Sequence, residues 1–418
     1  MKSMGMRRSM RLRGALGDLF GVTLASRNFR VFLIIMFING AIVGPFVPFL
    51  PVYVQEKLGA SQVFTAGLQT ATLVLGAVFV LFGGIISDTL GPKTSVLLGA
   101  LGTPLAAAVF MTGNYWALVG IAVARGISGG FGGGGGQTYL IETAPMKRLA
   151  SATAVYFMGN TLGAAIGSPL AGYVLEVAPF SMLGTIMLAT SIPMVLAVVF
   201  LLADVRPLGP ARPRAREVLA GYARIVRRRH VWSLAMMQYL RTCFWGVAVL
   251  AMPFLIHSLT GSKLAVGWFS SVSLISGMVS MFVAGSISDR IGRKPVVLAS
   301  LAAIGVSSLM LAVSTGNAAA MFLSGVVATT AAWTLSGQMT PLAKEVADTG
   351  EAGRLVGLIL FPHALGMLTG AQIHGALTES HPALMFAVLA GFLVAAWGFG
   401  SYMFRAWERR PPQVAALE

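Results

Sequence analysis

The chain has 418 residues, of which 56% are hydrophobic and only 11% are charged. Soluble domains carry about 25% charged residues, so this composition excludes a soluble protein and predicts an integral membrane protein. The formal net charge is +16, but the basic residues lie between apolar stretches rather than on one patch of a soluble fold, which excludes nucleic acid as an expected partner.

The first 30 residues are rich in arginine, contain Asp18 as their single acid, and are not followed by a short apolar stretch with a small-residue cleavage site. A cleaved signal peptide would have that short apolar stretch and that cleavage site. We therefore expect residues 1–30 to form a basic cytoplasmic arm that stays on the chain and contacts anionic lipid.

Twelve windows of about 20 apolar residues follow, and each is long enough to cross the hydrocarbon core as a helix. The first six are expected near 31–54, 64–87, 95–112, 115–140, 150–174 and 181–203. The second six are expected near 232–257, 265–288, 295–315, 318–341, 354–378 and 382–405. The predicted fold class is an all-α membrane protein with 12 transmembrane helices in two halves of six.

The fourth span contains the run GGFGGGGGQTYLIE at 129–142. Gly130, Gly132 and Gly135 match G-x-G-x-x-G, but a dinucleotide-binding loop follows a strand and opens a soluble βαβ unit. Lipid offers no partner to unpaired backbone groups, so the run is predicted to stay helical. Its small side chains allow a neighbouring helix or a substrate to come close.

Placing both termini in the cytoplasm puts nearly all of the 30 Lys and Arg residues on that side, as the positive-inside rule requires. We therefore expect a multi-pass protein of the plasma (cytoplasmic) membrane. The expected domains are an N-terminal six-helix bundle at 31–203, a cytoplasmic linker with a surface helix at 204–231, a C-terminal six-helix bundle at 232–405, and a cytoplasmic tail at 406–418.

The two halves repeat one another, because GGIISDTLGPK at 83–93 recurs as AGSISDRIGRK at 284–294. Parallel repeats are typical of transporters that bind substrate near the bilayer midplane between the repeats. These residues resemble the signature that the major facilitator superfamily carries between the second and third spans of each half. The matching positions are Gly84, Asp88, Gly91 and Lys93 in the first copy and Gly285, Asp289, Arg290, Gly292, Arg293 and Lys294 in the second.

In that family the signature acts as a cytoplasmic latch between the halves, so the resemblance implies a gating role for these ten residues. The alternative is that they only fix topology and turn geometry. Thr89 and Pro92 stand where the family usually has arginines, and we therefore expect the latch of the first half to be weaker than usual.

Two further patterns resemble family signatures. Arg125 and Gly129 in the fourth span resemble an R-x-x-x-G pattern that is linked to proton transfer in several members. Gly163, Gly167 and Pro169 in the fifth span, with two neighbouring glycines, resemble the glycine and proline signature of antiporters that export drugs. The pattern is most similar to that of the 12-span drug/proton antiporters. This resemblance adds Gly163, Gly167 and Pro169 to the expected gating set.

Polar groups inside a span are costly and mark candidate sites. Gln238, Arg241 and Trp245 fall at i, i+3 and i+7, hence on one helix face, where the indole could stack on the guanidinium and the guanidinium could hold an anionic group of the substrate. The alternative is that Arg241 has only a structural role, as the donor of an interhelical hydrogen bond. By resemblance Asn39, Arg125 and Trp333 would join them in lining the substrate cavity.

No Asp or Glu falls in the middle of a span, so proton coupling must use other groups. His363 is the main candidate, because an imidazole titrates near neutral pH. Arg125, Asp88 and Glu142 are the other candidates for coupling. A lone histidine in a span can equally serve as a hydrogen-bond partner between helices.

The expected function is a secondary active transporter that works by alternating access and exports a small amphipathic or drug-like compound in exchange for protons. The first alternative is a transporter of an organic anion or lipid-like acid, and the remote alternative is a non-transporting receptor or scaffold. No enzyme motif is present, and neither a cofactor nor a metal is expected. The expected partners are the substrate, protons and the lipid bilayer, and the chain is expected to be a monomer.

Overall fold

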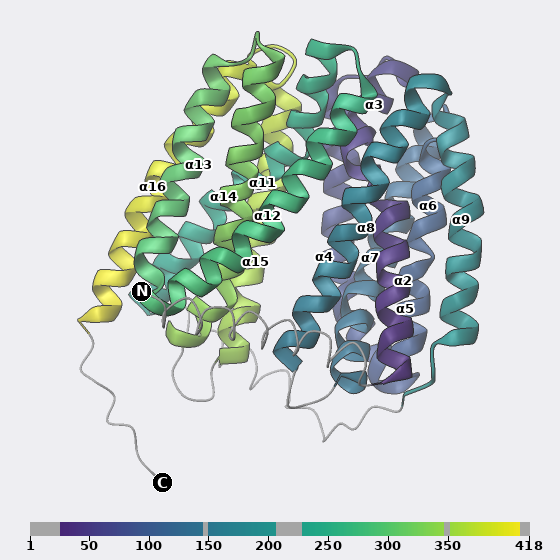
Figure 1. Cartoon of the computed structure of the whole chain (residues 1–418), viewed down its shortest axis with the longest axis horizontal. Helices are drawn as coiled ribbons and strands as arrows, with labels where there is room; N and C mark the ends of the chain where they lie inside the picture. The colour runs from purple at the N-terminus through teal and green to yellow at the C-terminus, as the bar shows by residue number, and fades with distance from the viewer. Residues whose placement is uncertain (1–25, 145–148, 206–227, 347–351, 410–418) are drawn as a thin grey trace, which may run out of the picture. The chain divides into compact units, whose positions relative to one another are not determined.

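The computed structural model describes residues 26–144, 149–205, 228–346 and 352–409. Within them the chain forms helices and no strands (Figure 1). The expected basic arm, the surface helix of the linker and most of the expected tail lie outside the described residues.

The helices follow the order of the expected spans. Those before the linker are α2 (Arg27–Val43), α3 (Phe46–Leu58), α4 (Gln62–Thr89), α5 (Pro92–Ala100), α6 (Gly102–Val109), α7 (Tyr115–Thr143), α8 (Leu149–Val177) and α9 (Phe180–Leu201). Those after it are α11 (Arg229–Thr260), α12 (Lys263–Ile291), α13 (Arg293–Val313), α14 (Ala318–Val346), α15 (Ala352–Leu377) and α16 (Pro382–Glu408). Among the described helices, 8 continuous segments are long and apolar enough to cross a membrane, one of them α2 and α3 taken together.

Two of the expected spans are divided into two helices. The first changes from α2 to α3 at Gly44 and Pro45, because proline has no N–H to donate to the preceding turn and its ring clashes with that turn. The third changes from α5 to α6 at Leu101, next to the small residues Ala100 and Gly102. Residue spacing alone predicted continuous helices at both places.

The described chain forms two compact units. Unit 1 consists of residues up to 47 together with 70–210, and unit 2 consists of 48–69 together with 211–418. In unit 1, α2 packs on α8, α5 on α7, and α6 on α9. In unit 2, α11 packs on α15 and α16, while α12 and α13 both pack on α14. The segment 48–69, which holds most of α3 and the start of α4, therefore belongs to the unit built mainly from the second half of the sequence.

The glycine run is helical, as predicted, because α7 continues from Tyr115 to Thr143 without a break. A Cβ built on Gly132 would lie 3.0 Å from Gly99 Cα on α5, and one built on Gly130 would lie 2.8 Å from Gly76 O on α4. Real Cβ atoms essentially never come so close to backbone, so the missing side chains let α4 and α5 approach α7 directly.

The core of unit 2 is built around α11, which is buried on several sides. Its buried side chains include Met237, Phe244, Val247 and Leu250, each at most 1% exposed. A helix that is apolar all round can bury every face against neighbours. Arg241 sits in the middle of this apolar helix, and its environment is therefore the first to consider.

Candidate substrate site

Arg241 is only 2% exposed and its guanidinium is bound by neutral groups. Its Nε and Nη2 donate to Gln238 Oε1 at 3.1 and 2.9 Å, and its Nη1 donates to Ser336 Oγ of α14 at 2.8 Å. No carboxylate in the described part of the chain forms an ion pair with it. A guanidinium has five N–H donors, so this arrangement holds the charge in place and leaves donors for a further acceptor.

Gln238 and Arg241 lie on one face of α11, as their spacing predicted. Trp245 continues that face, but its indole packs against Trp333 of α14 in an edge-to-face contact with ring centroids 5.2 Å apart. Trp333 in turn fills the space beside Gly277 of α12. The two indoles are half-buried, so they form an apolar wall near the Arg241 cluster rather than the predicted stack on the guanidinium.

His363 lies on α15 in the same unit and is half-buried. α15 packs along α11, the helix that carries Arg241. Unit 2 thus brings together Arg241, Gln238 and His363, all of which were predicted site residues. Ser336 completes the cluster and could not be selected from the sequence, because serines are frequent in every span.

Arg125 of α7 lies in unit 1 with a different type of partner. Its Cζ is 3.6 Å from the centroid of the Phe46 ring, which is a cation–π contact. Its Nε is buried and has no hydrogen-bond partner among the described residues. Both arginines predicted inside the membrane therefore lack a described carboxylate partner.

Asn39 of α2 lines a pocket within unit 1, together with Tyr156 and Asn160 of α8 and four glycines of α7. The volume of this pocket is about 230 Å³. Asn39 Oδ1 accepts a hydrogen bond of 2.7 Å from Thr103 Oγ1 of α6. Tyr156 and Asn160 were not predicted, and their position on α8 one turn apart is the signal that the sequence offered.

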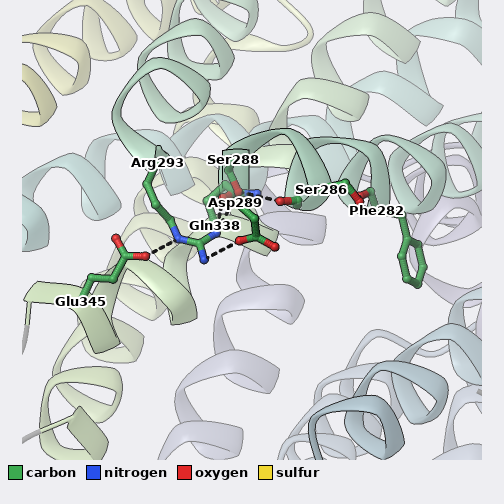
Figure 2. A network of polar contacts seen from close by, with 8 residues as sticks. Phe282, Ser286, Ser288, Asp289, Arg293, Gln338 and Glu345 are labelled. Carbon is green, nitrogen blue, oxygen red and sulfur yellow. Dashed lines mark hydrogen bonds and ion pairs between the residues drawn. The ribbon is translucent and has the colours of Figure 1, made fainter. Parts of the chain in front are cut away.

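The second copy of the repeated signature forms a polar network at the junction of α12, α13 and α14 (Figure 2). Arg293 Nη1 donates to Ser288 Oγ at 2.8 Å and to Gln338 Oε1 at 3.0 Å. Its Nη2 donates to Asp289 Oδ1 at 3.0 Å, and its Nε donates to Glu345 Oε1 at 2.8 Å. One planar guanidinium thus ties together three helices of unit 2.

The neighbouring signature residues have separate roles. Gly292 has φ of +86° at the turn between α12 and α13, a conformation that favours glycine. Lys294 Nζ pairs with Glu408 of α16 at 2.9 Å. Arg290 is exposed and forms no hydrogen bond or ion pair with the described residues, and Gly285 has open space beside it.

The first copy contains fewer described contacts. Gly91 has φ of +93° before α5, and Lys93 Nζ lies 3.6 Å from Asp204 Oδ1 in a surface pair. Such pairs contribute about 0–1 kcal/mol. The surroundings of Gly84 and the side chain of Asp88 lie outside what the structure describes. Glu142 is half-buried near the end of α7 without a described hydrogen bond.

The predicted gating glycines of α8 lie against the backbone of α2. A Cβ on Gly163 would collide with Phe37 O, and a Cβ on Gly167 would collide with Ala41 O. Pro169 lies inside α8, two residues further along. These glycines therefore have a packing role in unit 1, whatever role they have in gating.

Sequence reasoning missed two polar clusters that join segment 48–69 to the rest of unit 2. In the first, Glu56 contacts both His257 and Lys263. In the second, buried Gln62 contacts His374, and the backbone N–H of Gln62 donates to Glu379 Oε1 at 2.9 Å. The residues of each cluster are far apart in the sequence. The sequence indicated a possible contact only for Glu56 and His257, because both lie near the end of a helix.

The profile of the Major Facilitator Superfamily matches residues 32–252 and 234–417. A structure of a mutant of the nucleoside transporter NupG aligns with a TM-score of 0.76 at 14% identity, covering 90% of this chain and 99% of that one. A bacterial homolog of the human lysosomal transporter Spinster, described as inward-facing and unoccupied, aligns with a TM-score of 0.72 at 13% identity, covering 93% and 100%. At these identities the likeness concerns the fold alone. No curated protein sequence matches the chain.

Proposed function

Because the chain belongs to the Major Facilitator Superfamily and is a membrane transporter rather than an enzyme, we propose that it carries a small organic anion by alternating access. Secondary transporters with parallel repeats expose one substrate site to each side of the membrane in turn. The proposal concerns the kind of compound that this site accepts.

The observation that carries the proposal is the environment of Arg241. Burying a charge is costly unless a partner compensates it, and the described partners of Arg241 are the neutral Gln238 and Ser336. These partners hold the guanidinium in a fixed orientation but do not neutralise it. A carboxylate or similar group of a substrate would supply the missing negative charge through charge-assisted hydrogen bonds.

The surroundings of Arg241 suit the organic part of such a compound. Trp245 and Trp333 present half-buried aromatic surface from α11 and α14. Binding sites for small molecules combine apolar walls with a few well-placed polar groups. A compound with one anionic end and one apolar or aromatic end would use both features.

The second candidate is the proton-coupled export of an amphipathic or drug-like compound. His363 lies on α15, which packs on α11, and remains the main candidate for coupling because an imidazole can bind and release a proton. Arg125, Asp88 and Glu142 remain the other coupling candidates. The glycine and proline pattern of α8 supports drug export less, because packing on α2 already accounts for Gly163 and Gly167. We retain a plasma-membrane location, both termini in the cytoplasm and a monomeric state as parts of the proposal.

Two probes of the same shape and opposite charge test the substrate class. The full-length protein in lipid nanodiscs is titrated with 3-phenylpropionate or 3-phenylpropylammonium, and binding is measured as thermal stabilisation. We expect the anion to bind more tightly, and Arg241→Gln to weaken it by roughly 10- to 100-fold, as the loss of charge-assisted hydrogen bonds implies. Arg241→Lys would retain part of the affinity.

Arg405→Gln is the matched control, because Arg405 is exposed, lies in the last turn of α16 and belongs neither to this cluster nor to the gating set. It should leave the binding of both probes unchanged. Preference for the cation, or equal anion binding by Arg241→Gln, would overturn the proposal. Uptake of the more tightly bound probe into proteoliposomes is then measured with and without a pH gradient. Equal rates would show that transport is not coupled to protons.

A further inference from the structure

The pocket that opens in unit 1 is lined by five helices and contains no charged side chain. Its polar members are Asn39 of α2 and Tyr156 and Asn160 of α8, and its remaining lining comes from α5, α7 and α9. A drug-sized ligand needs roughly 300–1,000 Å³, so about 230 Å³ suits a fragment-sized molecule or one end of a larger one.

The pocket exists because one face of α7 has no side chains. A Cβ built on Gly129 would meet nothing within 4 Å, and a Cβ on Gly136 would meet only the hydroxyl of Tyr156, at 3.1 Å. The other face of the same helix is different, because a Cβ on Gly126 would lie 2.8 Å from Thr72 O. Gly126, Gly130 and Gly132 thus allow close helix packing, whereas Gly129 and Gly136 leave room for the pocket.

The two amides that line the pocket each keep an unused hydrogen-bonding group. Asn39 Oδ1 accepts from Thr103, which leaves its NH₂ group without a partner among the described residues. Asn160 Nδ2 donates to Met36 O at 3.4 Å, which leaves its carbonyl oxygen without one. A donor and an acceptor from two neighbouring helices therefore line the same small volume.

Tyr156 adds a hydroxyl whose position is fixed by packing. Its ring stacks on Phe32 of α2 with centroids 5.5 Å apart and meets Phe157 edge-on at 5.1 Å. The hydroxyl forms no hydrogen bond with the described residues and lies beside Gly136 of α7. It can donate to or accept from a bound molecule.

We propose that this pocket binds a small neutral group that carries a hydrogen-bond donor and acceptor side by side, such as a carboxamide or a lactam edge. The amides of Asn39 and Asn160 supply the complementary acceptor and donor pattern, and Tyr156 adds a third contact. The lack of charged lining disfavours an ion, and the open face of α7 admits a flat group. All of its lining residues belong to unit 1, and the inference does not depend on the anion selectivity proposed for the Arg241 cluster.

The test uses the full-length protein in lipid nanodiscs and ligand-observed saturation-transfer NMR. Benzamide offers the donor and acceptor pair, whereas N,N-dimethylbenzamide keeps the ring and the acceptor but has no donor. We expect benzamide to bind about fivefold more tightly than its dimethyl analogue, which corresponds to one hydrogen bond. Benzoate, measured in the Arg241→Gln background so that unit 2 does not contribute, should bind more weakly than benzamide.

Variants of residues that line the pocket test whether benzamide binds there rather than elsewhere on the protein. Gly129→Leu fills the open face and should abolish benzamide binding, while Gly120→Leu is the matched control because Gly120 lies on the same helix with open space and does not line the pocket. Tyr156→Phe and Asn160→Ala should each weaken binding about fivefold and keep the inference testable if Gly129→Leu fails to fold. Arg241→Gln should leave benzamide binding unchanged even if the anion proposal is wrong.

Three results would overturn the inference: equal binding of benzamide and its dimethyl analogue, unchanged binding by a folded Gly129→Leu variant, or unchanged binding by both Tyr156→Phe and Asn160→Ala. The first would show a pocket that selects only an aromatic ring. Either of the other two results would show that benzamide binds elsewhere on the protein and that this pocket holds only water.

Discussion

Glu56 Oε1 lies 2.7 Å from His257 Nε2, so a carboxylate of α3 meets an imidazole at the end of α11. The other oxygen of the same carboxylate accepts from Lys263 Nζ at 2.9 Å. His257 is 8% exposed, and its Nδ1 is buried without a partner in the described part of the chain. This cluster attaches the segment 48–69 to the remainder of unit 2.

We expect Glu56→Gln to lower the stability of unit 2 by about 1 kcal/mol, because a partly exposed carboxylate loses two charged or hydrogen-bonded partners. The measurement is the thermal unfolding temperature in nanodiscs, which should fall by about 2–4 °C for such a change. Lys57→Gln is the control, since Lys57 is the next residue of α3, is exposed and has no described partner. Identical unfolding temperatures for the two variants would show that the cluster adds nothing.

His374 is fully buried between Gln62 and Thr378, with contacts of 3.2 and 2.7 Å. We expect His374→Leu to destabilise the protein by about 1–3 kcal/mol, because it leaves the side-chain oxygen of buried Gln62 without a partner. The exposed His381→Leu is the matched control. Chemical denaturation of both variants gives the comparison, and equal midpoints would contradict the role assigned to His374.

The four contacts of Arg293 require its planar guanidinium. Arg293→Lys keeps the charge but cannot donate to Ser288, Gln338, Asp289 and Glu345 at once. We expect faster hydrogen exchange in the first turns of α13 and a loss of about 1–2 kcal/mol. Arg290→Lys, one turn away and without described contacts, should exchange like the wild type. If the two variants behave alike, the network is only a surface feature.

Two glycines of α8 provide a sharp test of helix packing. A Cβ on Gly163 would collide with Phe37 O, whereas one on Gly159 would lie 3.7 Å from Leu33 O, an ordinary contact. We expect Gly163→Ala to cost about 1–3 kcal/mol, as overpacking does, and Gly159→Ala to be tolerated. Yield of folded protein and unfolding temperature are the measurements. Tolerance of Gly163→Ala would mean that α8 can move off α2 at little cost.

The sequence was sufficient for the helical fold and for part of the site. Hydropathy placed the spans, and helical spacing correctly put Gln238 and Arg241 on one face. The partner of Trp245 was not predictable, because Trp333 lies on another helix and its approach depends on the space beside Gly277. Predicting such contacts requires the packing angles of whole helices, which residue spacing within one helix does not contain.

The unit boundary after Val47, within α3, bears on how this protein can be divided into fragments. The sequence repeats once near its middle, as a gene duplication would leave it, yet the contact units do not follow that boundary, since 48–69 belongs to unit 2. A fragment of residues 211–418 alone would lack Glu56 and Gln62, the residues that His257 and His374 contact. Such a fragment is therefore expected to leave His257 and His374 without the partners that segment 48–69 supplies.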